Sequence, residues 1–312
     1  MAERQRTQSG DDPFAGLNID SHESLENIKD RSFCPKCHAS RKYFCYTCII
    51  PMPEVASSLP TVSLPVHIDI IKHPREIDGK STAVHAAIIA PNDVTIYTYP
   101  DIPQFEDKAK VLLVYPTDNA VTLKDLVKME SSSTNGAAHS ESHIADTGLP
   151  PQPKRTKYAG IEGQSTEGVR QFERVVFIDS TWNQSNQIFR DERLQDLQCV
   201  ILKTQKTHFW RTQPDKPDTY LATIEAIYYF TLEYHQEILA TNYQGQYDNL
   251  LYFFSFMYKL VQKSTAETEG LSKEEKQVRH RRRTETTTLE AQLRRQKSRQ
   301  KCLTDLSVLI VN

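Results

Sequence analysis

The sequence predicts an α/β domain in which helices flank a parallel β-sheet. Five short apolar segments bounded by turn residues are typical of strands that are buried on both faces of such a sheet. These segments are residues 66–71, 94–99, 111–115, 175–178 and 199–203. The length of 312 residues allows one large domain with appendages, or two small domains.

Five further segments are predicted to be helical, and they are residues 123–129, 168–172, 181–194, 222–239 and 249–261. Residues 222–239 have the clearest helical spacing of apolar side chains. Residues 249–261 are apolar nearly all round the helix, so we expect this helix to be buried.

Part of the chain is predicted to lie outside the packed domain. Hydrophobic residues are 38 % of the sequence and the mean hydropathy is −0.56, both of which are low for a compact globular chain. Residues 1–30 are polar and acidic, which predicts a disordered leader. Residues 131–168 are rich in Ser, Thr, Gly, Pro and His, which predicts a disordered surface insertion.

Charge is distributed unevenly along the chain. The formal net charge is −2, yet residues 273–301 hold eleven Lys or Arg and four Glu, a local charge of +7 that leaves −9 for the rest. We therefore assign residues 265–312 to a basic C-terminal tail. A basic cluster at 279–283 indicates nuclear import or nucleic-acid binding, and the alternative is a solvated helical tail without a partner.

The chain lacks the features of membrane and secreted proteins. No run approaches the ~18 apolar residues that span a bilayer, and the N-terminus has no apolar signal segment. We therefore expect a soluble intracellular protein without membrane contacts. Six cysteines would then be mostly reduced, and a cluster of them favours a metal site over disulfides.

Four of the six cysteines form two C-x-x-C pairs within residues 31–52. The pairs are Cys34 with Cys37 and Cys45 with Cys48, and four thiolates complete a closed tetrahedral zinc site. The seven-residue spacer predicts a small hairpin with residues 41–44 at or near its tip. The alternative is free dithiols or a redox site, although a redox C-x-x-C normally opens a helix and no helix is evident here.

An acid, two hydroxyls and an indole follow the predicted strand 175–178. The residues are Asp179, Ser180, Thr181 and Trp182, and a helix begins among them. Ligands of α/β sheets bind at the carboxyl ends of strands, where a helix N-terminus offers free N–H groups. Asp179 is therefore a candidate base and Trp182 a candidate pocket residue. The alternative is a helix N-cap made by residues 179–181, with Trp182 in the core.

Two further segments carry weaker signals. His73 and Glu76 follow the first predicted strand, and Thr223 and Glu225 lie in the first turn of the helix 222–239, with Arg211 upstream. A single histidine is more often a surface or capping residue than a catalyst. Glu225 lies where the helix dipole favours an acid in any case.

Together these residues resemble the DTW-domain family of tRNA-uridine aminocarboxypropyltransferases, over roughly residues 31–261. The family's D-x-T-W motif stands here as Asp179-Ser180-Thr181-Trp182, its cysteine knuckle as Cys34, Cys37, Cys45 and Cys48, its H-P-x-E element as His73-Pro74-Arg75-Glu76, and its helix start as Ala222-Thr223-Ile224-Glu225-Ala226. The long insertion and the basic tail are most similar to the eukaryotic first paralogue of the domain.

The resemblance implies a fold and an activity. The fold is a SPOUT-like, knotted sheet flanked by helices, with an N-terminal four-cysteine zinc knuckle and a catalytic domain over 53–264. The activity is transfer of the 3-amino-3-carboxypropyl group of S-adenosylmethionine to N3 of a uridine in the tRNA D-loop, with release of methylthioadenosine. The geometry at the sulfonium selects which of its carbons reacts.

The resemblance also gives the candidate residues roles. Asp179 is the expected general base for the N3 proton, provided that burial raises its pKa, and otherwise it orients the uracil. Backbone N–H groups around Ser180 and Thr181, or Arg211, would hold the carboxylate of the donor, and Glu225 its ammonium. The full set expected at the cofactor is Ser180, Thr181, Trp182, Arg211, Thr223, Glu225, His73 and Glu76.

The expected partner is tRNA, and no obligate protein partner is expected. Because the remainder of the chain is acidic, phosphate contacts should concentrate at Lys36, Arg41 and Lys42 of the knuckle and in the tail. The cluster 279–283 predicts a nuclear location, and the cytoplasm is the second location considered. Two alternatives stay open: a SPOUT-like RNA methyltransferase, and a non-catalytic zinc-containing RNA-binding module, which would have no pocket at Asp179.

Overall fold

The computed structural model describes residues 12–134, 172–211 and 217–268, with 271–272, 275 and 278. Contacts divide the chain into two units, residues 1–258 and 259–312. The sheet, the cysteine cluster and the candidate site all lie in the first unit.

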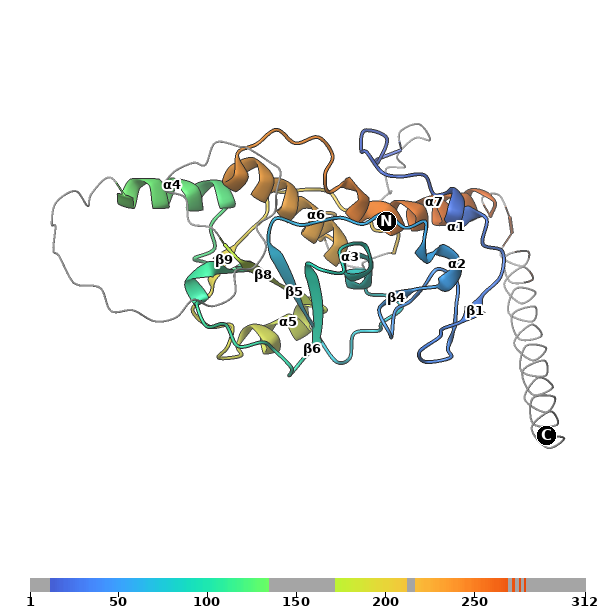
Figure 1. Cartoon of the computed structure of the whole chain (residues 1–312), viewed down its shortest axis with the longest axis horizontal. Helices are drawn as coiled ribbons and strands as arrows, with labels where there is room; N and C mark the ends of the chain where they lie inside the picture. The colour runs from blue at the N-terminus through green and yellow to red at the C-terminus, as the bar shows by residue number, and fades with distance from the viewer. Residues whose placement is uncertain are drawn as a thin grey trace, which may run out of the picture. The chain divides into compact units, whose positions relative to one another are not determined.

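A five-stranded parallel sheet forms the centre of this unit, with the strand order β6-β5-β8-β7-β9 (Figure 1). The strands are β5 (His67–Lys72), β6 (Val94–Thr98), β7 (Val111–Val114), β8 (Arg174–Asp179) and β9 (Gln198–Val200). All five predicted strands are confirmed, and so is their parallel arrangement. The central strand β8 pairs with both β5 and β7, and Lys72 pairs with Asp179 at the carboxyl ends of β5 and β8.

Alternate residues of the central strands enter two separate apolar clusters. Ile70, Leu112 and Phe177 belong to the larger cluster, which also contains residues of α3, α4, α6 and α7. Leu113 and Val176 belong to the smaller cluster, which contains Ile188 of α5. The sheet is therefore covered by helices on both faces, which explains why its strands read as continuous apolar runs.

Helices cover both faces of the sheet and join its strands (Figure 1). Their bounds are α1 (Glu23–Glu26), α2 (Pro53–Ala56), α3 (Ala83–Ile89), α4 (Leu123–Thr134), α5 (Trp182–Phe189), α6 (Thr223–Tyr234) and α7 (Tyr252–Ala266), with short 3-10 turns η1 (Lys108–Lys110) and η3 (Asp248–Leu251) and a π-helical turn η2 (His235–Leu239). None of the described helices has the length and apolar character needed to cross a bilayer.

The predicted helices are mostly confirmed. Residues 123–129 lie in α4, 222–239 in α6 and η2, and 249–261 in η3 and α7. The helix predicted at 181–194 is shorter, because turns replace it after Phe189. Of the segment 168–172 only Phe172 is described, and it is not helical. Helix α3 was not predicted, because all seven of its side chains are buried and leave no polar face to reveal a period.

The prediction of a disordered leader is wrong for residues 12–30. Phe14 is buried with its ring against Phe254 and Tyr258, and Leu25 is fully buried. His22 lies 3.0 Å from the Tyr252 carbonyl oxygen through its Nε2. Widely spaced apolar residues show no sequence period, yet each fits among side chains near the start of α7. Most of the insertion 131–168 and most of the basic tail lie outside the described residues.

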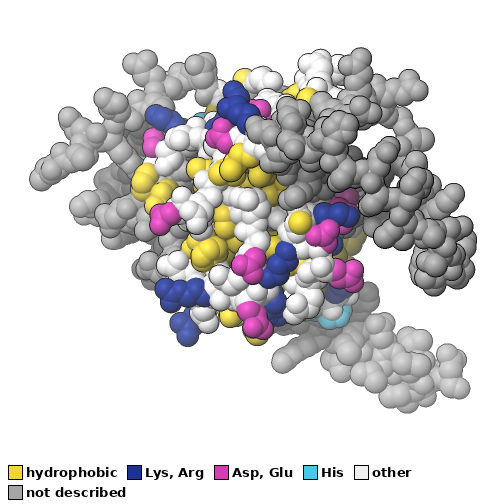
Figure 2. Space-filling view, turned by 90° about the vertical axis from the view of Figure 1, so that its left-hand side faces the viewer, with side chains coloured by type: hydrophobic (Ala, Val, Ile, Leu, Met, Phe, Trp, Pro, Cys, Tyr) yellow, Lys and Arg dark blue, Asp and Glu magenta, His cyan; other side chains and the backbone are white. Residues whose placement is uncertain are grey.

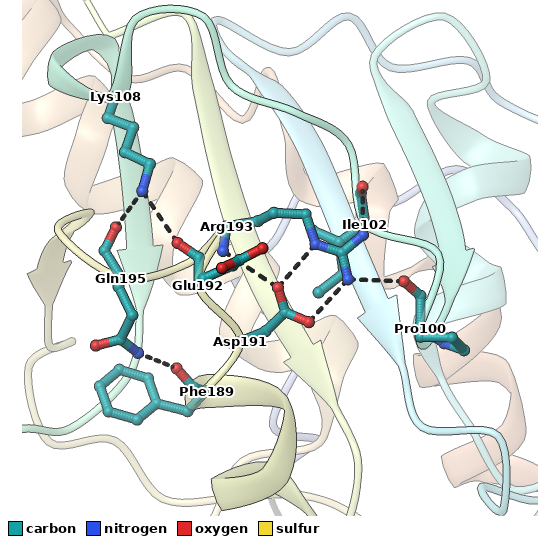
Figure 3. Close-up of polar contacts among 8 residues, drawn as sticks. All are labelled: Pro100, Ile102, Lys108, Phe189, Asp191, Glu192, Arg193 and Gln195. Carbon is teal, nitrogen blue, oxygen red and sulfur yellow. Dashed lines mark hydrogen bonds and ion pairs between the residues drawn. The ribbon is translucent and has the colours of Figure 1, made fainter.

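A polar cluster fixes the segment that follows α5 (Figure 3). Arg193 forms an ion pair with Asp191 and donates hydrogen bonds to the carbonyl oxygens of Pro100 and Ile102. Lys108 donates to the Gln195 carbonyl oxygen at 2.6 Å. These bonds tie the chain between α5 and β9 to the loop before β7, and so they fix the carboxyl-terminal end of α5.

A buried ion pair joins β5 and β8, and it gives the first testable prediction. Arg174 donates to both carboxylate oxygens of Asp69 at 2.7 and 2.6 Å, and Asp69 is fully buried. Replacing Arg174 by Ala leaves that charge without its guanidinium. We expect Arg174→Ala to lower the unfolding free energy in urea by about 3 kcal/mol, the low end for a broken buried pair, because Arg174 is itself one-third exposed.

The matched control is Lys110→Ala, which removes the exposed pair of Lys110 with Glu173 beside the same strands. It should leave stability nearly unchanged, since exposed pairs contribute little. Equal losses in the two variants would contradict the importance of the buried pair.

Candidate active site

The carboxylate of Asp179 lies at the carboxyl end of β8 and is only 5 % exposed. Its Oδ2 accepts a hydrogen bond from Ser81 Oγ at 2.7 Å, and its Oδ1 accepts one from Thr223 Oγ1 at 2.5 Å. Ser81 lies just before α3 and Thr223 is the first residue of α6. Asp179 therefore joins the central strand to the start of two helices.

Further bonds hold these two helix starts together. Ser81 Oγ also accepts from the N–H of Ala83, and Thr82 Oγ1 accepts from the N–H of Ile224, both at 3.1 Å. Free N–H groups at helix starts need such acceptors. The hydroxyls of Ser81 and Thr223 are thus held on opposite oxygens of one carboxylate.

The environment of Asp179 makes it a stronger base than an ordinary aspartate. Burial raises the pKa of this carboxyl group, and the hydroxyl hydrogen bonds from Thr223 and Ser81 offset part of that effect. The pKa of the nearby Glu76 is also raised, by burial and by the negative charge of Asp179. A general base at this position requires that burial raise the pKa of Asp179, and the pKa is raised.

A cavity of about 450 Å³ opens at the carboxyl ends of β7, β8 and β9, and we call it the sheet-end cavity. Its walls combine apolar side chains with hydroxyl groups. The residues that line it include Tyr115, Ser180, Ser185, Val200, Ile201, Leu202, Thr219, Leu221 and Thr223. Volume and lining are typical of a site for a small organic molecule. A cavity next to Asp179 also counts against the non-catalytic alternative.

The D-x-T-W residues are divided between this cavity and α5. Ser180 lines the sheet-end cavity. Thr181 is exposed and is the N-cap of α5, where its N–H donates to Gln184 Oε1 at 3.4 Å. The capping interpretation is thus correct for Thr181, whereas Asp179 caps neither end of α5. Trp182 is the first residue of α5, and its side chain lies outside the described part of the structure.

Glu225 is buried and fully engaged in a structural role. Its Oε2 accepts from Thr207 Oγ1 at 2.6 Å and from the N–H of Ala222 at 2.7 Å, and its Oε1 accepts from the N–H of His208 at 2.7 Å. The structure therefore places Glu225 as a cap of α6 that also fixes the 207–208 loop. These three hydrogen bonds account for the buried carboxylate of Glu225 without an ammonium group from a donor.

The other predicted residues occupy three different positions. His73 is buried, its N–H donates to the Asp179 carbonyl oxygen, and its Nδ1 accepts from the N–H of Arg75. Glu76 is half-buried near Asp179. Arg211 does not line the sheet-end cavity; its Nη2 donates to the Gly79 carbonyl oxygen at 3.0 Å.

The four predicted cysteine ligands converge as the spacing indicated. The sulfur atoms of Cys34, Cys37, Cys45 and Cys48 all lie within 4.8 Å of one another. Tetrahedral coordination with metal–sulfur bonds of about 2.3 Å needs sulfur atoms roughly 3.8 Å apart. Burial alone would raise the pKa of Cys45, but the Cys48 N–H and neighbouring thiols lower it to about 6, whereas burial and the same neighbouring cysteines raise the pKa of Cys48, so that a first thiolate disfavours a second. The donor set therefore fits a soft divalent metal ion.

The spacer between the two pairs is not an exposed hairpin tip. Two small hairpins form instead, β1 (Ser32–Phe33) with β2 (Ser40–Arg41) and β3 (Phe44–Cys45) with β4 (Ile50–Pro51). Between them Tyr43 is buried against Phe256, and Phe44 contacts Phe253. Aromatic packing thus fixes the cysteine cluster to the first unit, and Figure 1 shows β4 of the second hairpin beside α2 and α3.

A second cavity, of about 250 Å³, lies between the knuckle and the Ser81 loop, and we call it the knuckle cavity. Five cationic side chains and one carboxylate line it: Arg31, Arg41, Lys42, Lys80 and Arg211, with Asp78. On the face shown in Figure 2, by contrast, basic and acidic side chains are interspersed among apolar ones. The knuckle cavity is therefore a local concentration of positive charge in a chain that is acidic outside its tail.

Sequence reasoning missed several residues of these cavities. Ser81 was not among the candidate residues, because its bond to Asp179 joins residues far apart in the chain. His85 lies inside the apolar run of α3, where nothing in the sequence separates it from a core residue. Tyr115 bonds Ser185 in the sheet-end cavity, and no local pattern pairs the two.

The chain is similar in sequence to several known proteins. "tRNA-uridine aminocarboxypropyltransferase 1" of Xenopus laevis is 49 % identical over 257 residues, which cover 80 % of this chain and 87 % of the relative. The proteins of the same name from Mus musculus and Homo sapiens are 45 % and 44 % identical, over 84 % and 81 % of this chain and 88 % and 85 % of theirs. No solved structure matches. The model of the DTW domain matches residues 42–262, and the chain therefore belongs to the DTW-domain family.

Proposed function

We propose that this chain is a tRNA-uridine aminocarboxypropyltransferase. It transfers the 3-amino-3-carboxypropyl group of S-adenosylmethionine to N3 of a uridine in the tRNA D-loop and releases methylthioadenosine. The observation that carries the proposal is a buried carboxylate, Asp179, beside a cavity at the end of the sheet. It stands in a chain 44–49 % identical to relatives of that name.

The sheet-end cavity is the proposed site of the donor. Its volume of about 450 Å³ suits a small organic molecule such as S-adenosylmethionine. Its apolar walls with scattered hydroxyls suit a molecule that has both apolar and polar parts. Ser180 and Thr223 would contact the donor there, whereas Glu225 and Arg211 are engaged elsewhere. When bound, S-adenosylmethionine supplies an electrophilic carbon next to its sulfonium.

Asp179 is proposed to remove the N3 proton through the hydroxyl of Thr223. Thr223 lines the cavity, and its Oγ1 already donates to Asp179 Oδ1. As this oxygen takes the N3 proton, its own proton passes to the carboxylate, and N3 is left as a nucleophile. The raised pKa of Asp179 favours this transfer, because a stronger base accepts the proton more readily.

Zinc is the proposed metal of the cysteine cluster. Four thiolates form a closed coordination shell, which is typical of structural zinc and leaves no open position for a substrate. The metal would thus shape the knuckle, while the transfer chemistry takes place at Asp179.

We also propose a knotted sheet, tRNA as the partner and a nuclear location. A SPOUT-like knotted path is supported by a strand order that departs from the order along the chain, since β8 lies between β5 and β7. Binding of tRNA is supported by the names of the relatives and by the cations of the knuckle. Nuclear location is supported by the basic cluster at 279–283.

Nucleoside mass spectrometry of tRNA incubated with the protein and S-adenosylmethionine tests the reaction. The wild-type chain should yield aminocarboxypropyl-uridine, and Asp179→Ala and Thr223→Val should yield at most about one hundredth as much. Thr223→Ser keeps the hydroxyl and should retain most activity, while donor binding should stay measurable in every variant. Methyl-uridine as the product would identify the methyltransferase alternative, and normal product from Asp179→Ala would remove that residue from the mechanism.

The pH dependence follows from the pKa of Asp179. Only the ionised carboxylate accepts a proton, so activity is lost as the pH falls through the folded-state pKa of this group. Because burial raises that pKa, the acid limb of kcat/KM should lie above the ~3.9 of an ordinary aspartate. An acid limb at or below that value, measured with tRNA intact throughout, would contradict the assignment.

Metal analysis of the purified chain tests the cysteine cluster. About one zinc ion per chain is expected, and Cys34→Ser and Cys45→Ser should lose most of it and lower the melting temperature. Cys199→Ser is the matched control, since Cys199 is a free cysteine on β9, outside the cluster. Retention of full zinc content by Cys45→Ser would show that the cluster is not the metal site.

A further inference from the structure

The knuckle cavity approaches Asp179 from a different direction than the sheet-end cavity. Ser81 lines the knuckle cavity and bonds Oδ2 of Asp179, whereas Thr223 lines the sheet-end cavity and bonds Oδ1. One lining residue of each cavity therefore bonds the same carboxylate. A ligand in the knuckle cavity would lie beside the reacting centre without occupying the donor site.

One buried side-chain nitrogen in the lining of this cavity, Nδ1 of His85, has no hydrogen-bond partner within the described residues. His85 is only 4 % exposed, and its ring packs against Phe44 and Phe253. Leaving a buried polar group unsatisfied is costly, so such atoms are rare unless a ligand completes them. His85 lines the knuckle cavity, so its orphaned nitrogen indicates a ligand with a hydrogen-bonding edge.

The charge of the lining indicates that this ligand is also anionic. The single carboxylate, Asp78, is ion-paired with Lys72. The cations are held in place: Arg211 donates to the Gly79 carbonyl oxygen, and Arg41 lies over the ring of Tyr46 at 3.8 Å.

We propose that the knuckle cavity binds a nucleotide of the tRNA that flanks the target uridine. Lys42 and Arg211 contact its phosphate, while the base lies between the aromatic side chains of Tyr46 and Trp210 with an edge toward His85. This inference rests on the proposed function. Single-stranded RNA is commonly read in this way, by cations on the backbone and by aromatic walls and hydrogen bonds at the base.

A charge-removal experiment tests the phosphate contacts. The double variant Lys42→Ala, Arg211→Ala should bind tRNA at least tenfold more weakly near physiological salt. The slope of log Kd against log salt should decrease by about 1.5, as two phosphate contacts are lost. Arg41 is left unchanged because it contacts the cysteine cluster. The matched control is Lys124→Ala, Lys128→Ala on α4, which removes two exposed charges outside the cavity and should leave the slope unchanged.

A second variant separates ligand binding from folding. His85→Phe keeps an aromatic ring against Phe44 and Phe253 and removes the orphaned nitrogen. A residue with only a packing role would show no change in RNA affinity. We expect about fivefold weaker tRNA binding with the melting temperature unchanged or raised, because an unsatisfied buried atom disappears while a contact to the base is lost.

The outcomes distinguish this inference from the proposed function. If the wild-type chain makes aminocarboxypropyl-uridine while both cavity variants bind tRNA normally, the nucleotide site is wrong and the function stands. If the wild-type chain binds tRNA through the cavity but makes no product, the function fails. If the α4 control variant lost as much tRNA affinity as the Lys42, Arg211 variant, the proposed nucleotide site would also be wrong, because the loss would be a diffuse electrostatic effect.

Discussion

The carboxylate of Asp179, held by two hydroxyl groups, is the interaction on which the rest of this site depends. It connects the central strand β8 to the beginnings of α3 and α6. Its hydrogen-bond donors are neutral, so they position the carboxylate without cancelling its charge. Burial then raises its pKa, whereas a bonded guanidinium would have lowered it. Burial therefore makes Asp179 more basic than an ordinary aspartate, while the two hydroxyl contacts hold the carboxylate in place and offset part of that shift.

Comparison with Glu225 shows why burial alone does not identify a catalytic group. Burial raises the pKa of both carboxylates. Two backbone N–H groups and the Thr207 hydroxyl engage Glu225, and all three bonds fix the start of α6 and the preceding loop. Asp179 instead bonds two hydroxyls that line cavities, and a hydroxyl can pass a proton on, as a helix-capping N–H cannot. The partners, more than the pKa, separate the two roles.

The sequence predicted the elements of this fold better than its contacts. Continuous β-branched runs were enough to locate all five strands, because strands covered on both faces have no polar alternation to confuse them. The same full burial concealed α3, and the leader residue Phe14 was missed because its partners are some 240 positions away in the chain. The cysteine ligands were predictable because their spacing is local. The position of Arg211 was not, since it depends on the distant Gly79 carbonyl oxygen.

The cysteine cluster serves the site through the surfaces that it holds in place. Tyr43 and Phe44 anchor the knuckle on α7, and Phe44 also contacts His85 of α3. Arg41 connects the cluster to Tyr46, which in turn packs against Gly79 two residues before Ser81. A continuous series of contacts therefore runs from the sulfur atoms to the hydroxyl that bonds Asp179. Because four thiolates would leave a bound metal no open position, we propose that the cluster influences the reaction only along this series, by fixing where a substrate RNA would meet the carboxylate.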